Sequence, residues 1–140
     1  MRILALDHGT VRIGVAVSDD LKMIAQPLEF IPAEPFANFL TRLKEIILAK
    51  EVEMILVGIP RNMDGSYGPA AEKAQQFILV LKEALTIPIK SWDERLTSVQ
   101  ANRFLIEAGI RREKRKTKVD QTAAAIMLQS YLDSLGSQSF

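Results

Sequence analysis

The stretch ILALDHGTVRIGVAVS, residues 3–18, decides the fold. Its first part, residues 3–6, is a short apolar run that ends at Asp7, as a buried strand does where it meets a turn. Residues 13–18 form a second run of β-branched and small side chains. Gly9 lies between the two runs and can adopt the positive φ that a tight hairpin needs. The stretch therefore predicts two antiparallel strands at the start of a sheet.

The rest of the chain alternates between helical and strand patterns. The apolar run at residues 52–57 is typical of an inner strand of a parallel pair, and the residues after Pro35 repeat at helical spacing. The other predicted elements are a strand at 28–31, a loop at 58–68, a helix at 69–85, a strand at 87–92, a helix from 97 to before Gly109 and a last helix from Thr117 to near Gly136. Three strands followed by β-α-β crossovers predict an α/β fold, with a mixed five-stranded sheet flanked by helices.

The composition sets further limits. A length of 140 residues predicts one domain, residues 1–140. The absence of cysteine excludes disulfides, iron–sulfur clusters and thiol catalysis. Without a leader segment or a long apolar run, the sequence predicts a cytoplasmic protein that does not enter a membrane. A net charge of +1 is compatible with nucleic acid as a partner but does not require it. The composition leaves open whether the chain is a monomer or a homodimer.

Carboxylates occur at three separate places where predicted elements begin or end. Asp7 ends the first strand, where ligands gather in open α/β sheets, although an Asp before a turn is also an ordinary turn former. Asp93 and Glu94 follow the strand at 87–92, and an acidic pair there would also suit the start of a helix. Asp120 comes three residues after Thr117 and would also complete a helix cap.

Asp120 carries the most information of these acids. It shares one helical face with Ala124, Met127 and Tyr131, and an ionised carboxylate facing a sheet is costly unless it is paired or bound to metal. Carboxylates from separate elements, in a chain with one His and no Cys, suit a hard cation such as Mg²⁺ or Mn²⁺. Such sites suit the cleavage of phosphodiester bonds.

Basic residues gather just before the last predicted helix. The run from Arg111 to Lys118 is predicted either to bind a nucleic-acid backbone beside the acids or to form a solvated loop. Arg12 either contacts substrate or pairs with Asp19 across the first hairpin. His8 is predicted to lie on the strand face opposite Asp7, without a catalytic role. The predicted substrate-binding residues are Arg12, Arg61, Arg95, Arg112, Lys114, Arg115, Lys116 and Lys118.

Four segments, in order along the chain, resemble the motifs of the YqgF/RuvX family. They are DHGTVRIGVAVSD at residues 7–19, GIPRNMDGS at 58–66, DERLTS at 93–98 and KVDQTAAAIML at 118–128. Each motif is weak by itself, whereas four in order with sensible spacing are specific. The resemblance covers nearly the whole chain.

The resemblance implies a ribonuclease-H-like fold related to the Holliday-junction resolvase RuvC, and a metal-dependent nuclease that processes precursor 16S rRNA. It implies that the catalytic and metal-binding acids are Asp7, Glu94 and Asp120, with Asp93 as the alternative to Glu94. Resolvases carry a second acid one turn after the helix Asp, where this chain has Ala123. Weaker metal binding, and weaker resolvase activity, are therefore expected.

The leading hypothesis is a Mg²⁺- or Mn²⁺-dependent endonuclease that acts on structured RNA at the 5′ end of precursor 16S rRNA. One alternative is a Holliday junction resolvase that cuts four-way DNA junctions. Another is a non-catalytic nucleic-acid-binding module in ribosome assembly or transcription. A phosphotransferase of the sugar-kinase type is disfavoured, because it needs a second lobe that 140 residues do not supply.

Overall fold

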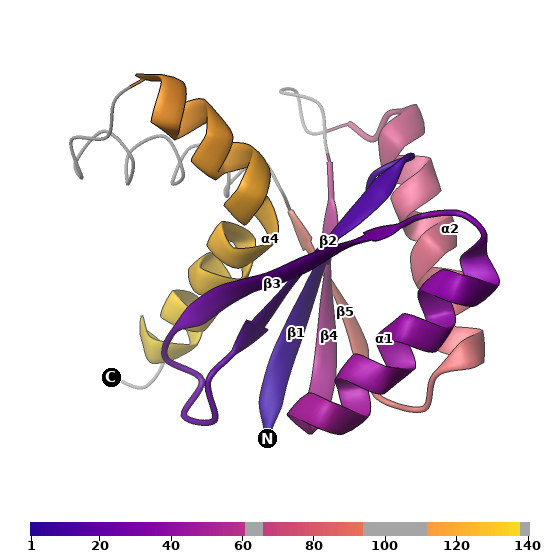
Figure 1. The fold of residues 1–140 in the computed structure, drawn as a ribbon, viewed down its shortest axis with the longest axis horizontal. Helices are drawn as coiled ribbons and strands as arrows, with labels where there is room; N and C mark the ends of the chain where they lie inside the picture. Colours follow the sequence, from indigo (N-terminus) through magenta and orange to yellow (C-terminus); the bar gives the residue numbers. More distant parts are fainter. Residues whose placement is uncertain (61–65, 94–111, 138–140) are drawn as a thin grey trace.

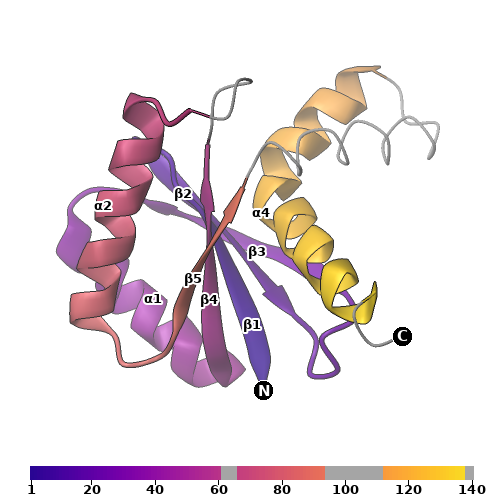
Figure 2. The ribbon, with the colours of Figure 1, turned by 180° about the vertical axis from the view of Figure 1, so that it is seen from behind.

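A mixed five-stranded sheet lies between two helical layers (Figures 1 and 2). The computed structural model describes residues 1–60, 66–93 and 112–137, and within the last range the side chains of residues 123–135. The strands are β1 (Arg2–Asp7), β2 (Arg12–Ser18), β3 (Ala25–Pro32), β4 (Val52–Ile59) and β5 (Ile89–Asp93), and the helices are α1 (Phe36–Lys50), α2 (Pro69–Ala84) and α4 (Arg112–Ser137).

The strand order is β3-β2-β1-β4-β5. The first three strands pair antiparallel, whereas β4 pairs parallel with both β1 and β5. The predicted mixed five-stranded sheet is confirmed. Because β1, β4 and β5 are parallel, their carboxyl ends meet at one edge of the sheet, and α4 begins near that same edge (Figure 1).

Some predicted boundaries were wrong. Strand β3 begins at Ala25 rather than at residue 28, so it contains Pro27. A proline is tolerated there because β3 is an edge strand, where a missing N–H need not cost a ladder hydrogen bond. Strand β5 begins at Ile89, directly after Pro88, rather than at residue 87. The helix predicted from residue 97 to Gly109 lies outside the described residues.

The last helix also begins earlier than predicted, at Arg112 rather than at Thr117. Thr117 is therefore an interior position of α4 and not its cap. Residues 112–118 belong to the first turns of this helix, so the interpretation of the basic run as a loop is wrong for them. Arg, Lys and Glu are good helix formers, and their propensity extends the helix beyond the capping signal.

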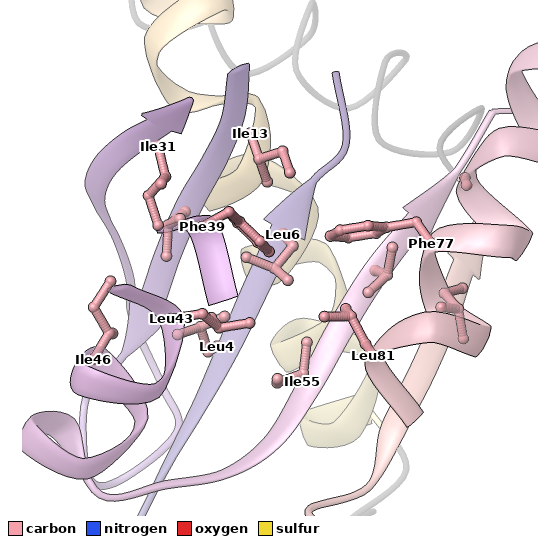
Figure 3. Close-up of a cluster of buried hydrophobic side chains, with 14 of the residues drawn as sticks. Leu4, Leu6, Ile13, Ile31, Phe39, Leu43, Ile46, Ile55, Phe77 and Leu81 are labelled. Atoms are coloured by element: carbon pink, nitrogen blue, oxygen red, sulfur yellow. The ribbon is translucent and has the colours of Figure 1, made fainter. Parts of the chain in front are cut away.

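The larger core lies between the sheet and the α1/α2 layer. It includes Leu4 and Leu6 from β1, Phe39 from α1, and Phe77 and Leu81 from α2 (Figure 3). Leu4, Leu6, Phe39 and Leu81 are fully buried. Along β1, Leu4 and Leu6 alternate with Ile3 and Ala5, which face α4. This is the period-two pattern of a strand covered on both faces.

The smaller core lies between the sheet and α4. Small side chains meet there: Ala5 of β1 and Ala16 of β2 pack against a group that includes Ala124 and Ala125 of α4. Ala124 and Ala125 are both buried, whereas Ala123 is half-buried. Short side chains on both surfaces let the helix backbone lie near the strands.

Gln129 fixes α4 against the β2–β3 hairpin. Its Oε1 accepts a hydrogen bond from the Ala25 N–H at 2.9 Å, and its Nε2 donates to the Met23 carbonyl at 2.9 Å. Because both the oxygen and the nitrogen of the Gln129 amide are hydrogen-bonded to the hairpin, they fix the position of α4 along the sheet. The register of the helix against the strands is thereby set.

Arg42 of α1 connects the helical layer to the edge strand β3. It donates two hydrogen bonds to the Glu29 carboxylate, at 2.6 and 2.9 Å, and a third to Glu45 at 3.0 Å. The hydrogen bond from Arg42 holds the pKa of Glu29 below its ordinary value of 4.5. A carboxyl with a lowered folded-state pKa stabilises the fold above the unfolded pKa, and that contribution is lost as the pH falls through the folded value.

Glu29→Gln is therefore expected to lower the free energy of unfolding at pH 7 by about 0.5 kcal/mol, the scale of a largely exposed ion pair. The difference from the wild type should become smaller as the pH is lowered to 3, because Glu29 of the wild type is protonated as the pH falls through its lowered pKa. Urea unfolding at both pH values measures this. Glu45→Gln is the control, because Glu45 is 60% exposed and makes a single contact, and its effect should be smaller. A loss of unfolding free energy in Glu29→Gln that is as large at pH 3 as at pH 7 would contradict the link between the Glu29 pKa and stability.

Candidate active site

Asp7 is the last residue of β1, and it is half-buried. Along this strand Leu4 and Leu6 belong to the core under α1 and α2, whereas Ile3 and Ala5 belong to the core under α4. Side chains alternate along a strand, so Asp7 lies on the α4 face of the sheet. It lies there at the edge where the three parallel strands end.

The positions beside Asp7 on the neighbouring strands are glycines. Gly14 of β2 pairs directly with Asp7. On β4, Gly58 follows Val57, which pairs with Leu6. A methyl group at Gly14 would lie 3.6 Å from the Asp7 Cβ and 3.3 Å from the Phe30 ring. The two glycines thus add no side chain of their own beside the Asp7 carboxylate, and the Phe30 ring of β3 reaches over Gly14 on one side.

Asp93, the last residue of β5, lies on the opposite face of the sheet from Asp7. Two residues of β5, Lys90 and Trp92, contact the ring of Tyr131 on α4: the Lys90 Nζ lies 5.1 Å from its centroid, and the ring centroids of Trp92 and Tyr131 are 5.6 Å apart. Asp93 is next along the strand and pairs with Ile59, which belongs to the core under α1 and α2. Strand alternation therefore separates Asp93 from Asp7.

The other two predicted acids are described less fully. Glu94 lies outside the described residues. Asp120 belongs to α4, one turn before Ala124, and its side chain is outside the described part. Among the side chains that the structure describes, no group of three His, Cys, Asp or Glu residues is placed to hold a metal ion. The predicted set consists of carboxylates alone, and that donor set suits Mg²⁺ or Mn²⁺.

Arg12 lies at the start of β2, exposed and on the same face as Gly14. Its guanidinium carbon lies 4.2 Å from the centroid of the Phe30 ring, which is a cation–π contact. The alternative prediction, an ion pair with Asp19, is wrong. Asp19 follows the other end of β2, and its carboxylate accepts hydrogen bonds from the Met23 and Ile24 N–H groups at 2.8 and 3.0 Å. Those backbone hydrogen bonds, that of Ile24 first, lower the pKa of Asp19.

The remaining predicted substrate-binding residues fall into two groups. Arg61 and Arg95 lie outside the described residues. The others belong to the first turns of α4, and their side chains are outside the described part: Arg112, Lys114, Arg115, Lys116 and Lys118. Phe30 was not predicted from the sequence, because its contact with Arg12 depends on the pairing of β2 with β3.

His8 lies on the face opposite Asp7, as predicted. Its ring centroid is 4.6 Å from that of Phe77 on α2. Burial lowers the pKa of His8, an effect that the Asp7 charge opposes and the Lys73 charge reinforces. The imidazole is therefore neutral at neutral pH and packs against the helical layer away from Asp7.

Two comparisons with solved structures support the fold. The structure described as "T. thermophilus RuvC in complex with Holliday junction substrate" is similar with a TM-score of 0.62 and 16% identity, covering 98% of this chain and 96% of that one. The fowlpox virus Holliday junction resolvase is similar with a TM-score of 0.53 and 13% identity, covering 96% and 99% of the two chains. Together with the strand order, these likenesses show that the chain has the ribonuclease-H-like fold found in RuvC.

The chain belongs to the RuvX family, whose model is described as Holliday junction resolvase and matches residues 1–134. A relative from Halothermothrix orenii is 52% identical over 95% of each chain, and its name is "Putative pre-16S rRNA nuclease". A relative from Desulforamulus reducens with the same name is 49% identical, over 96% of this chain and 98% of its own. The predicted family is confirmed. Among the described residues, no helix has the length and apolar character needed to cross a membrane.

Proposed function

We propose that the protein is a Mg²⁺- or Mn²⁺-dependent endonuclease that hydrolyses phosphodiester bonds of structured RNA at the 5′ end of precursor 16S rRNA, in the cytoplasm. The observation that carries the proposal is the place of Asp7 in a RuvX-family chain. This carboxylate lies at the carboxyl edge of three parallel strands, on the α4 face, between two glycine positions. The names of the relatives favour precursor 16S rRNA as the substrate.

In this proposal Asp7, Glu94 and Asp120 hold the metal. Strand alternation supports Glu94 over Asp93, because Asp93 lies on the α1/α2 face and the next position of an extended strand would turn back toward α4. The helical repeat supports Asp120, because Ala124, four residues later, is buried against the sheet.

Each group has a distinct task. A divalent ion would supply Lewis acidity for phosphodiester hydrolysis, with the three carboxylates as its oxygen donors. Arg12 and the basic residues in the first turns of α4, Arg112, Lys114, Arg115, Lys116 and Lys118, would bind the phosphate backbone, with Arg61 and Arg95 as further contacts. The glycines beside Asp7 leave room for the substrate strand to approach.

Glu94→Gln is expected to lower kcat for cleavage by about a hundredfold or more, because it removes one charged donor of the metal. Asp93→Asn is the matched control, and it should change kcat by less than about threefold, since Asp93 lies on the other face of the sheet. Single-turnover cleavage of a labelled precursor rRNA fragment with Mn²⁺ measures both. The reverse order of effects would make Asp93 the site residue.

A second candidate function is the cleavage of four-way DNA junctions, favoured by the description of the family model. Incubation of purified protein with equal amounts of labelled precursor rRNA and junction DNA, with and without Mn²⁺, separates the two. Preferential cleavage of the RNA supports the proposal, and preferential cleavage of the junction supports the resolvase. Metal-independent binding without cleavage of either would leave a non-catalytic nucleic-acid-binding module.

A further inference from the structure

Arg12 and Phe30 form a pair on the surface of the sheet near Asp7. The guanidinium carbon of Arg12 lies 4.2 Å from the ring centroid of Phe30, which is 38% exposed. Ile31, the next residue of β3, is buried in the opposite core, so Phe30 lies on the α4 face. The ring therefore restrains a guanidinium on the face that carries Asp7.

Gly14 connects this pair to the candidate site. It pairs with Asp7 on one side and with Phe30 on the other, so the three residues lie side by side across β1, β2 and β3. A methyl group at Gly14 would contact both neighbours. Gly14 thus lies directly between Asp7 and the ring that contacts Arg12. None of the described carboxylates forms an ion pair with Arg12.

We infer that Phe30 is a positioning residue for Arg12. Its ring orients the Arg12 guanidinium so that it binds a backbone phosphate of the substrate strand, next to the bond that is cleaved at Asp7. The inference rests on the proposed function. Stacking occupies one flat face of the guanidinium and leaves the N–H groups on its edge free for bidentate contact with phosphate oxygens. Restraint by the ring also reduces the side-chain freedom that Arg12 loses on binding.

The test measures binding of a labelled RNA fragment that spans the 5′ end of precursor 16S rRNA, in EDTA so that no cleavage occurs. Arg12→Ala should raise Kd about tenfold and reduce the slope of log Kd against log salt by about 0.7 to 0.9, as expected for one phosphate contact. Phe30→Leu should raise Kd about two- to fivefold, the scale of an exposed cation–π pair. Phe30→Tyr keeps the ring and should bind as the wild type does.

The double variant decides between positioning and direct contact. If Phe30 acts through Arg12, Phe30→Leu has no further effect in the Arg12→Ala background. An equal loss in both backgrounds would overturn the inference, because Phe30 would then contact the RNA itself or matter only for the fold. Lys44→Ala removes one exposed charge from α1, on the other side of the sheet, and serves as the control. A change in slope as large as that of Arg12→Ala would also overturn the inference.

The binding test of Phe30 and the cleavage test of the nuclease proposal can fail independently. Coupling between Arg12 and Phe30 in a protein that cleaves no RNA would contradict the nuclease and leave the phosphate contact in place. Cleavage by a wild-type protein that shows no coupling would contradict only the role of Phe30. Thermal melting of each variant verifies that the fold is retained.

Discussion

Asp7→Asn is expected to lower kcat for RNA cleavage by at least about 10³-fold, the largest functional effect of any substitution considered. Asn keeps the shape of the side chain, but it loses the negative charge and one of the two oxygen donors of the carboxylate. The fold should remain intact, because the half-buried side chain lies between glycine positions and takes no part in either core. Single-turnover kinetics with Mn²⁺, together with thermal melting, measures both quantities.

Asp20→Asn is the control for the loss of one carboxylate. Asp20 lies just beyond the other end of β2, 61% exposed, and pairs with Arg2 at 3.5 Å. Its substitution should leave kcat within about twofold of the wild type, as a surface change far from the site does. Full turnover by Asp7→Asn would refute the assignment of Asp7, and an equal loss in Asp20→Asn would attribute the effect to net charge.

Phe39→Ala is expected to lower the free energy of unfolding by about 3–5 kcal/mol. Phe39 is fully buried beside Phe77 (Figure 3), and the two ring centroids are 5.7 Å apart. The ring centroid of Phe36 lies 5.9 Å from that of Phe39. Removal of the ring leaves a cavity among packed aromatic and aliphatic side chains. The loss should lower Tm by roughly 10–15 °C in a domain of this size, which differential scanning calorimetry measures directly.

Phe36→Ala is the matched control, because Phe36 is only partly buried against the same core. Its cost should be about 1–2 kcal/mol. Well below the Tm of both variants, cleavage should proceed at nearly the wild-type rate, since both rings lie on the face opposite Asp7. A loss of cleavage without a loss of stability would mean that the α1/α2 layer contributes to the site itself.

The sequence predicts most of the fold because its signals are local. The apolar runs of β1, β2 and β4 and the helical repeats of α1 and α2 each lie within one segment. The predicted start of α4 was wrong because a capping signal at Thr117 competes with a run of helix-forming charged residues. The helix propensity of that run extends the helix to Arg112. Boundaries depend on such competition, whereas the existence of an element does not.

The candidate site was predictable in part. Asp7 follows from its place at the end of an apolar run. The choice between Asp93 and Glu94 does not, because it requires the face of β5, which the contacts of Lys90 and Trp92 with Tyr131 on α4 reveal. The contact of Phe30 with Arg12 joins residues 18 positions apart through a strand pairing that contains an irregularity between Val15 and Ala16. No local pattern in the sequence encodes it.

The alternation of side chains along β1 has a consequence for the choice of metal. Asp7 and His8 are consecutive, and they face opposite layers of the molecule. A slip of β1 by one position would exchange every side chain between the two layers and would present an imidazole where the oxygen donor now lies. Nitrogen ligands suit zinc and copper better than magnesium. In the proposed metal site, the packing of Ile3 and Ala5 beneath α4 would therefore determine which donor atom faces the ion, and with it the ion selectivity.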